Sequence, residues 1–173
     1  MKEFDINSIN TSNYKEVIEF EYTQQWLKKN TQIRGWLIFY LIIMTMGIFG
    51  SAISSLIYFI WTNNAFIFIP VIAGITFAIL SFNAISERKP NALFFTRCYL
   101  ALTIIVNIQG LLTAVDTISH IIHIAVAIIW ICYFYQSDVV EEVIPSEYRE
   151  VNNKDYLIAT IGILATVISL FVI

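Results

Sequence analysis

A run of 52 residues without a charged side chain, Gly35 to Ser86, is the feature that most limits how this chain can fold. A helix crosses ~30 Å of hydrocarbon with ~20 apolar residues, so the run has room for two membrane helices and a turn. Further uncharged runs cover residues 98–115, 117–137 and 156–173, and each fits one helix. The sequence therefore predicts five membrane-spanning helices, at about 36–60, 65–86, 92–115, 117–136 and 156–173.

The composition agrees with a membrane protein. Of the 173 residues, 58% are hydrophobic and 13% are charged, whereas a soluble domain has roughly 45–50% apolar and about 25% charged residues. Only helices and closed barrels satisfy the backbone in lipid, and runs such as VIAGITFAIL lack the alternation of barrel strands. We expect an all-α polytopic transmembrane bundle, with four helices in a core and a C-terminal fifth.

The polar segments divide the chain into a cytoplasmic N-terminal arm (1–34), a four-helix transmembrane core (35–136), an acidic cytoplasmic linker (137–155) and a C-terminal transmembrane helix (156–173). With five spans, all ten basic residues fall on one side: Lys2, Lys15, Lys28, Lys29, Arg34, Arg88, Lys89, Arg97, Arg149 and Lys154. Basic residues near helix ends mark the cytoplasmic face. We expect a bacterial cytoplasmic (inner) membrane protein with its N-terminus inside, its C-terminus outside and no cleaved signal peptide.

Two cytoplasmic segments have helical patterns. In the arm, aromatic and aliphatic residues recur close to helical spacing, which fits an amphipathic helix on the membrane, a docking helix or a helix folded against the bundle: Tyr14, Val17, Ile18, Tyr22 and Trp26. In the linker, residues 139–144 place valines and an isoleucine opposite Glu141 and Glu142, and Pro145 should end that helix. This segment either extends the fourth span or contacts a partner. Possible partner contacts are Trp26, Asp138, Glu141 and Glu142.

A carboxylate and two imidazoles share one face of the fourth predicted span. His120 and His123 follow Asp116 by four and seven residues. At ~100° per residue, they lie about 40° and −20° from Asp116 around the helix axis. Such a group can bind a metal ion or relay protons, and ionisable residues within membranes are often functional. Alternatively, Asp116 interacts favourably with the helix N-terminus and the histidines lie in a wet interface.

Other polar and small residues inside the spans have structural interpretations. Asn107 and Gln109 in the third span either line a polar path or bond neighbouring helices. Small residues at four-residue spacing, such as Gly47, Ser51 and Ser55 or Gly110 and Ala114, predict close helix packing. We expect Cys98 and Cys132 to be buried, reduced side chains, and Pro70 to kink the second span.

Three stretches carry a family resemblance: RGWLIFYLI at 34–42, SERKPNALFFTRCYLALTII at 86–105 and IIWICYFYQSDVVEE at 128–142. They resemble a bacterial multi-pass membrane family catalogued as domain of unknown function 2569, over about residues 34–144. The resemblance implies four membrane helices and no particular activity. The chain departs from the family pattern at Cys132, where proline is usual, at Val139, where arginine is usual, and in the acidic residues that replace a largely basic neighbourhood.

Signatures of common enzymes are missing from the sequence. It has no GxSxG or HExxH and no glycine-rich phosphate loop. Glu141-Glu142 is similar to the paired glutamates of intramembrane CAAX proteases, but position 146 is serine where they have arginine. A pI of 5.3 without a basic stripe disfavours nucleic acid.

We therefore predict a non-enzymatic interaction, accessory or immunity-type protein. It needs no catalytic residues and no cofactor, and its partners are the lipid bilayer and either another protein or a second copy. The alternative is a small transporter, channel, or metal or proton sensor that uses Asp116, His120 and His123 as its metal site and the intramembrane Asn107.

Overall fold

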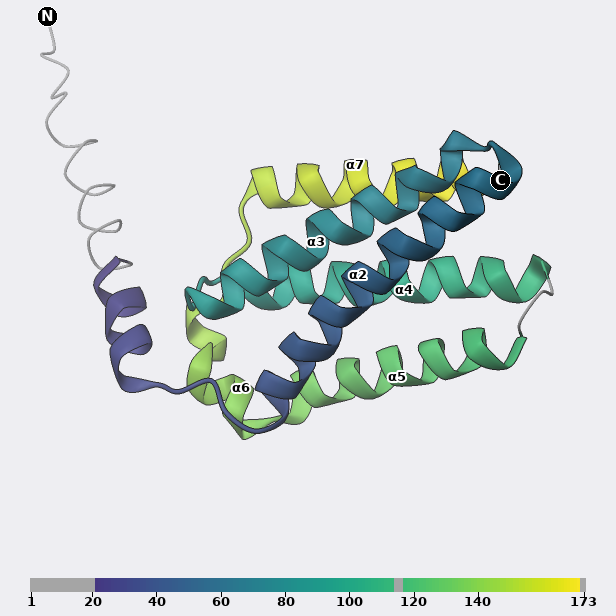
Figure 1. Ribbon diagram of the computed structural model, residues 1–173. Helices are drawn as coiled ribbons and strands as arrows, with labels where there is room; N and C mark the ends of the chain where they lie inside the picture. Colours follow the sequence, from purple (N-terminus) through teal and green to yellow (C-terminus); the bar gives the residue numbers. More distant parts are fainter. Residues whose placement is uncertain (1–20, 114–116, 172–173) are drawn as a thin grey trace, which may run out of the picture.

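The computed structural model describes residues 21–113 and 117–171, which form helices and no strand. Residues 21–30 are helical and precede five long helices (Figure 1). These are α2 (Trp36–Thr62), α3 (Phe68–Ser86), α4 (Ala92–Thr113), α5 (Thr117–Gln136) and α7 (Asn153–Leu170). Short elements connect them: η1 (Ala65–Ile67), α6 (Asp138–Val143) and η2 (Ser146–Tyr148). The predicted all-α bundle of four helices and a fifth is confirmed.

The outer surface of the bundle is apolar. Each of the five long helices is long and apolar enough to cross a membrane, when α3 is taken together with η1. In the most apolar 18-residue stretch of each helix, only 17 to 39% is buried inside the protein. The remaining side chains point outward, among them Trp61 at 85% exposed and Leu112 at 77%. A soluble monomer rarely exposes a contiguous apolar patch of more than about 300–600 Å². The chain is a multi-pass membrane protein, and lipid covers these faces.

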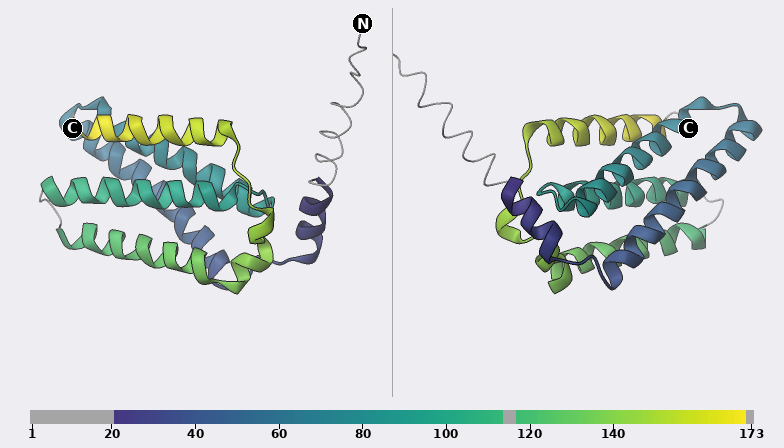
Figure 2. Two further views of the ribbon diagram at one scale, coloured as in Figure 1. Left: turned by 180° about the vertical axis from the view of Figure 1, so that it is seen from behind. Right: turned by 60° about the vertical axis from the view of Figure 1, so that its left-hand side comes forward.

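The helices form a bundle in which α3 and α4 are central. The helix α5 packs on α4, and α7 packs on both α3 and α4. The helix α2 crosses the others obliquely, and Figure 2 shows the same tilt from two further directions. Its 27 residues span ~40 Å at 1.5 Å per residue. Because this exceeds the ~30 Å of the hydrocarbon layer, tilting allows α2 to fit the bilayer.

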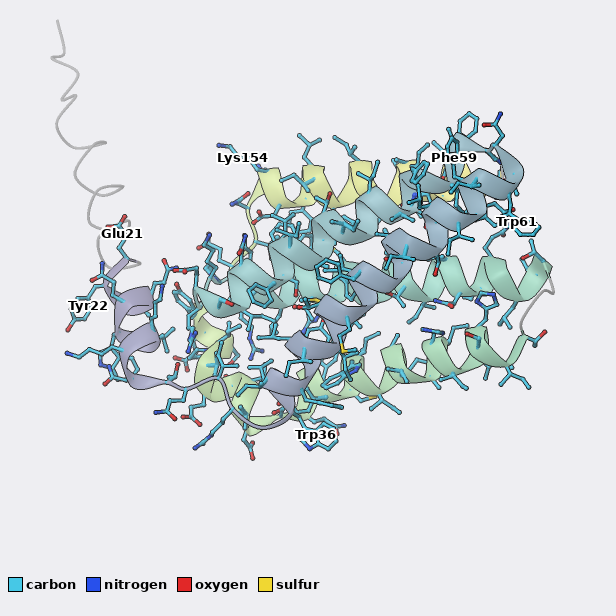
Figure 3. The ribbon with its side chains drawn as sticks, viewed as in Figure 1. Glu21, Tyr22, Trp36, Phe59, Trp61 and Lys154 are labelled. Atoms are coloured by element: carbon cyan, nitrogen blue, oxygen red, sulfur yellow. The ribbon has the colours of Figure 1, made fainter. Side chains whose placement is uncertain are left out.

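The two ends of the bundle differ in charge. All described lysines and arginines lie at the end where α2, α4 and α7 begin and α3 and α5 finish, which we call the basic end: Lys28, Lys29, Arg34, Arg88, Lys89, Arg97, Arg149 and Lys154. The opposite end, called the far end, has none in the part of the chain that the structure describes. Trp36 and Trp61 lie at opposite ends of α2 (Figure 3), as interfacial tryptophans do.

An aromatic cluster joins α2 to α5 near the basic end. Trp130 of α5 lies between Trp36, Phe39 and Tyr40 of α2, with ring centroids 6.4, 6.4 and 4.9 Å away. Phe134 adds a second edge-to-face contact with Tyr40, at 4.8 Å. Pairs of this kind contribute about 0.5–1.5 kcal/mol each beyond the burial of their area. The cluster therefore fixes α2 against α5 at this end.

Polar caps set the bounds of α7. The side chain of Asn152 accepts a hydrogen bond from the Asp155 amide, and Asp155 accepts one from the Asn152 amide, which is a capping box. The buried Asp155 also accepts a bond from Asn91 at 3.1 Å. The helix consequently begins at Asn153, three residues before the predicted residue 156.

Three further expectations need correction. The fourth span does not extend through the linker, because Ser137 adopts an extended conformation and caps a separate helix, α6. Pro70 lies at the third residue of α3 and not in its interior, and in the first turn of a helix the missing N–H of proline costs no helix hydrogen bond. Cys98 is buried as predicted, but Cys132 is exposed on α5.

We predict that Gly162→Ala destabilises the bundle where α7 meets α3. A Cβ atom at this position would lie 2.7 Å from the ring of Phe77, so the helices must separate or the ring must move, at a cost of about 1–3 kcal/mol. Thermal unfolding in detergent micelles measures the loss. The matched control is Gly50→Ala in α2, where a Cβ meets nothing within 4 Å. An equal change in both variants would contradict the proposed close packing.

Candidate functional site

Three of the polar residues predicted within the membrane lie at one cleft between α2 and the other core helices. The cleft has a volume of about 670 Å³, and its lining includes Asn107 of α4 and both His120 and His123 of α5. Tyr58, near the end of α2, lines it as well, which places the cleft toward the far end. The structure therefore brings together three of the residues that the sequence singled out.

His120 is held in place by two residues of α4. The Asn107 side chain donates to the Thr103 carbonyl at 2.8 Å, so its oxygen faces His120 Nδ1, which lies 2.9 Å away. Since this oxygen can only accept, Nδ1 carries the hydrogen. Gly110 makes room for the ring, because a Cβ atom at this position would overlap Cε1, Nε2 and Nδ1 of His120. In the neutral ring, Nε2 is then an acceptor without a partner among the described residues.

His123 has the same tautomer for a different reason. Its Nδ1 lies 2.7 Å from the Ser119 carbonyl oxygen, one turn earlier in α5. A carbonyl only accepts, so Nδ1 donates and Nε2 of the neutral ring is left as an acceptor. His123 is exposed and lines a second cavity of about 440 Å³ in addition to the cleft. The two imidazoles thus have the same tautomer, and both side chains line the cleft.

The third predicted metal ligand, Asp116, lies outside the described residues. Among the residues that the structure does describe, no three His, Cys, Asp or Glu side chains come together as a metal site. The possible donors at the cleft are Nε2 of His120 and Nε2 of His123. A closed zinc site requires four ligands, so the described part of the cleft supplies an open, two-nitrogen arrangement.

Gln109 does not take part in the cleft. Its side-chain amide donates to the Leu170 carbonyl at 3.2 Å, which ties α4 to the last turn of α7. Bonding a neighbouring helix is one of the two roles predicted for the polar residues of the third span; lining a polar path is the other. Asn107 has both roles, because it bonds His120 of the neighbouring helix and also lines the cleft.

Sequence reasoning missed the contribution of α2 to the cleft. Five of its small residues line the cleft: Gly47, Gly50, Ser51, Ser54 and Ser55. A Cβ atom added at Gly50 would meet no other atom within 4 Å. The four-residue spacing was visible in the sequence, but spacing alone does not tell a packed face from a cavity wall. Gly110 behaves as predicted, since α5 approaches it closely through His120.

A second candidate region lies at the basic end, where the N-terminal arm folds back on the bundle. Gln24 donates to the Glu87 carbonyl at 2.7 Å, and Lys28 pairs with the Glu87 carboxylate at 2.7 Å. Leu27 is buried, and Thr31 accepts a bond from Arg88. The arm therefore packs on the turn between α3 and α4, which agrees with the predicted alternative of a helix folded against the bundle.

The outer face of this arm helix is aromatic. Tyr22 is 69% and Trp26 is 53% exposed, and their spacing of four residues puts them on one face. Tyr22 points away from the bundle (Figure 3). Tyr14, Val17 and Ile18, which complete the predicted apolar stripe, lie outside the described residues. The described part of the arm presents two aromatic rings that no neighbouring helix covers.

An unusual turn supports the arm. Arg88 has φ of +53°, a left-handed conformation that glycine favours at the end of a helix. Its guanidinium is nearly buried and donates to the Ser86 and Thr31 carbonyls at 2.6 and 3.1 Å. Burial lowers the pKa of this guanidinium below its ordinary value. The bond to Thr31 links the strained turn directly to the arm.

The acids of the linker are engaged within the chain. Arg34 pairs with Glu142 at 2.8 Å, and Arg149 pairs with Glu141. The Ser146 amide donates to Glu141 and, together with Arg149, holds the pKa of that carboxyl below its usual range. Asp138 is exposed at the first turn of α6. Of the three predicted acidic partner contacts, Glu141 and Glu142 have internal partners.

Comparison of the chain with protein-family models, curated proteins and solved structures finds no match. The resemblance to domain of unknown function 2569 therefore stays a prediction. The structure adds one observation about the stretches on which it is based. Residues 34–42 meet residues 128–142 through the aromatic cluster and the Arg34–Glu142 pair, and Arg97 of the second stretch stacks on Tyr135 of the third at 4.4 Å.

We predict that the turn after α6 loosens in acid. The lowered pKa of Glu141 means that its ionised form stabilises the fold; this contribution is complete above the ordinary pKa of about 4.3 and is lost as pH falls through the lowered value. Hydrogen exchange of the Ser146 amide, corrected for its intrinsic rate, reports the loss. Glu141→Gln should lower protection already at neutral pH, whereas Glu142→Gln, the matched control, should not. Equal loss in both would refute the role of Glu141.

Proposed function

We propose that this protein is a non-enzymatic interaction protein of the bacterial cytoplasmic membrane, an accessory or immunity-type component, which presents a fixed helix to a protein partner in the cytoplasm. The observation that carries the proposal is the arm helix, whose inner face is bound to the bundle while Tyr22 and Trp26 are exposed. Aromatic residues dominate the energetics of protein interfaces. A helix that is already ordered also loses less entropy on binding.

The distribution of charge supports the orientation that this function requires. The described basic residues lie at the end that carries the arm, and positive residues favour the cytoplasmic side. The N-terminus is then cytoplasmic and the C-terminus, after a fifth crossing, is outside. The contact surface would consist of Tyr22, Trp26 and the exposed Asp138. Glu141 and Glu142 support it from within the chain through Arg149 and Arg34.

Photo-crosslinking in native membranes tests the docking helix. A photoreactive amino acid at Trp26 should give one reproducible adduct with a protein, and the adduct should weaken when Tyr22 is changed to Ala in the same chain. The matched control is the same photoreactive residue at Trp61, which is more exposed but lies at the far end. No reproducible adduct at position 26, or the same adduct at position 61, would rule out the docking function.

A second candidate function is transport or sensing at the cleft. The specific observation in its favour is that His120 and His123 line the same intramembrane space with the same free nitrogen. With Asp116 they would form a metal or proton site at the far end, and Asn107 would position His120. In this case the protein needs no cytoplasmic partner for its function.

Metal binding tests this second candidate. If the cleft holds a divalent ion, Zn²⁺ should bind to the reconstituted protein, and binding should weaken at least about tenfold, or ~1.4 kcal/mol, in the double variant His120→Ala, His123→Ala. Isothermal titration in nanodiscs measures the affinity. Asp138→Asn, which removes a carboxylate at the basic end, is the control. Zinc affinity that is unchanged in the double variant would remove the metal site.

A further inference from the structure

The cleft and the second cavity form one path along the inner side of α2. They share Gly47, Tyr99, Thr103 and His123 in their linings. The 670 Å³ cleft reaches Tyr58 and His120 toward the far end, while the 440 Å³ cavity reaches Tyr40 and Trp130, in the aromatic cluster near the basic end. Ligand sites typically occupy about 300–1,000 Å³. Each part of the path lies within this range.

The path opens sideways between α2 and α5. Among its lining residues, Met46 of α2 and Val126 and His123 of α5 are exposed. Figure 2 shows that α2 and α5 diverge away from their contact at the basic end. Both helices cross the membrane, so the opening faces hydrocarbon. An occupant would therefore enter from the bilayer.

The described lining of the path offers no partner to an ionic headgroup. Among residues 21–113 and 117–171, none that lines the cleft or the second cavity is an aspartate, glutamate, lysine or arginine. A charged group in this position would lose its hydration without gaining an opposite charge, which is costly in a medium of low polarity. A neutral polar group has only to make hydrogen bonds. The path consequently favours an uncharged ligand.

The polar atoms of the path suit a hydroxyl group. Nε2 of neutral His120 and of neutral His123 accepts hydrogen bonds, because Nδ1 of each ring is the donor to Asn107 and to Ser119. A hydroxyl donates to such a nitrogen, and it can accept from the Ser54 hydroxyl on the α2 wall, since the hydroxyls of Ser51 and Ser55 donate to carbonyls of their own helix. An ether or hydrocarbon would leave the imidazole acceptors without a donor. These groups lie toward the far end, whereas the other end of the path is apolar and aromatic.

From this we infer that the path between α2 and α5 binds a single-chain, uncharged amphiphile with a hydroxyl headgroup, of the monoacylglycerol class. The headgroup lies against His120 and His123 toward the far end, and the chain runs past Gly47 and Tyr99 toward Trp130. This matches the direction of a lipid in the far-end leaflet. The inference rests on the second proposed function, that the cleft is a binding site, and names its ligand.

Photo-labelling of the full chain in phosphatidylcholine nanodiscs tests this inference. The probe is a monoacylglycerol with a photoreactive group in its acyl chain. Labelling should be saturable, should map to residues of α2, α3, α4 and α5 that line the path, and should be displaced by unlabelled monoacylglycerol. Phosphatidic acid in its single-chain (lyso) form, with the same acyl chain, should displace it at least about tenfold less well, because its charge has no partner among the described residues of the path.

Two variants locate the site. His120→Phe keeps a ring over Gly110 but removes both nitrogens, and it should weaken labelling about fivefold to tenfold, as expected for one or two lost hydrogen bonds. Ser54→Leu, which fills the cleft from the α2 wall, should reduce labelling without breaking the Asn107–His120 bond, and it serves if the first variant fails to fold. The control is Tyr156→Phe, which removes a polar atom from an exposed ring of α7 outside the path.

The outcomes separate this inference from the function on which it rests. Unsaturable labelling spread over all lipid-facing helices, equal displacement by phosphatidic acid, or unchanged labelling in both variants would each overturn the monoacylglycerol assignment. If zinc then binds with the histidine dependence described above, the cleft is still a binding site and only its ligand is wrong. If zinc does not bind either, both fail. The docking helix at the basic end is tested independently.

Discussion

The aromatic contact between α2 and α5 determines the shape of this bundle. Trp130 and Phe134 hold Tyr40 at the basic end, while the other end of α2 continues through η1 into α3. A helix attached to α5 at one end and to α3 at the other must cross the bundle obliquely. The space that this crossing leaves between α2 and α5 cannot be closed by α4 alone, and it becomes the cleft.

The histidines are informative because of what surrounds them. An imidazole on an apolar span is ordinarily a packing residue or a wet interfacial one. Here His120 is placed by Asn107 and by a glycine that leaves room for its ring, and both rings present an acceptor to the same cavity. Among the described residues, the far half of the protein has polar side chains and no charged one, while the charged groups gather at the basic end.

The basic end is a connected unit of arm, turn and linker. Arg88 accepts an unfavourable backbone conformation, and its side chain joins the turn to the arm. Arg34 joins the start of α2 to α6, and Arg149 joins α6 to the segment before α7. Exposed ion pairs contribute little stability individually. Their role is to fix the orientation of short segments that have few buried residues of their own.

Much of the fold was predictable because lipid imposes simple rules. The spans follow from uncharged runs, and their bounds agree with the structure within a few residues, except where the Asn152–Asp155 capping box starts α7 earlier. The break at Ser137 was not predicted, because a valine-rich amphipathic segment directly after a span looks like its continuation. Cys132 was wrongly expected to be buried, since hydropathy in a membrane protein does not distinguish a core face from a lipid face.

The sequence by itself predicted five membrane-spanning helices with the basic residues at one end, since an unpaired charge in hydrocarbon is costly. It also predicted that Asp116, His120 and His123 share one helical face. The tertiary structure alone decided that His120 bonds Asn107, that the small residues of α2 line a cavity, and that Tyr22 and Trp26 face outward. These depend on the tilt of α2 and on contacts between residues distant in the chain, which no local pattern encodes.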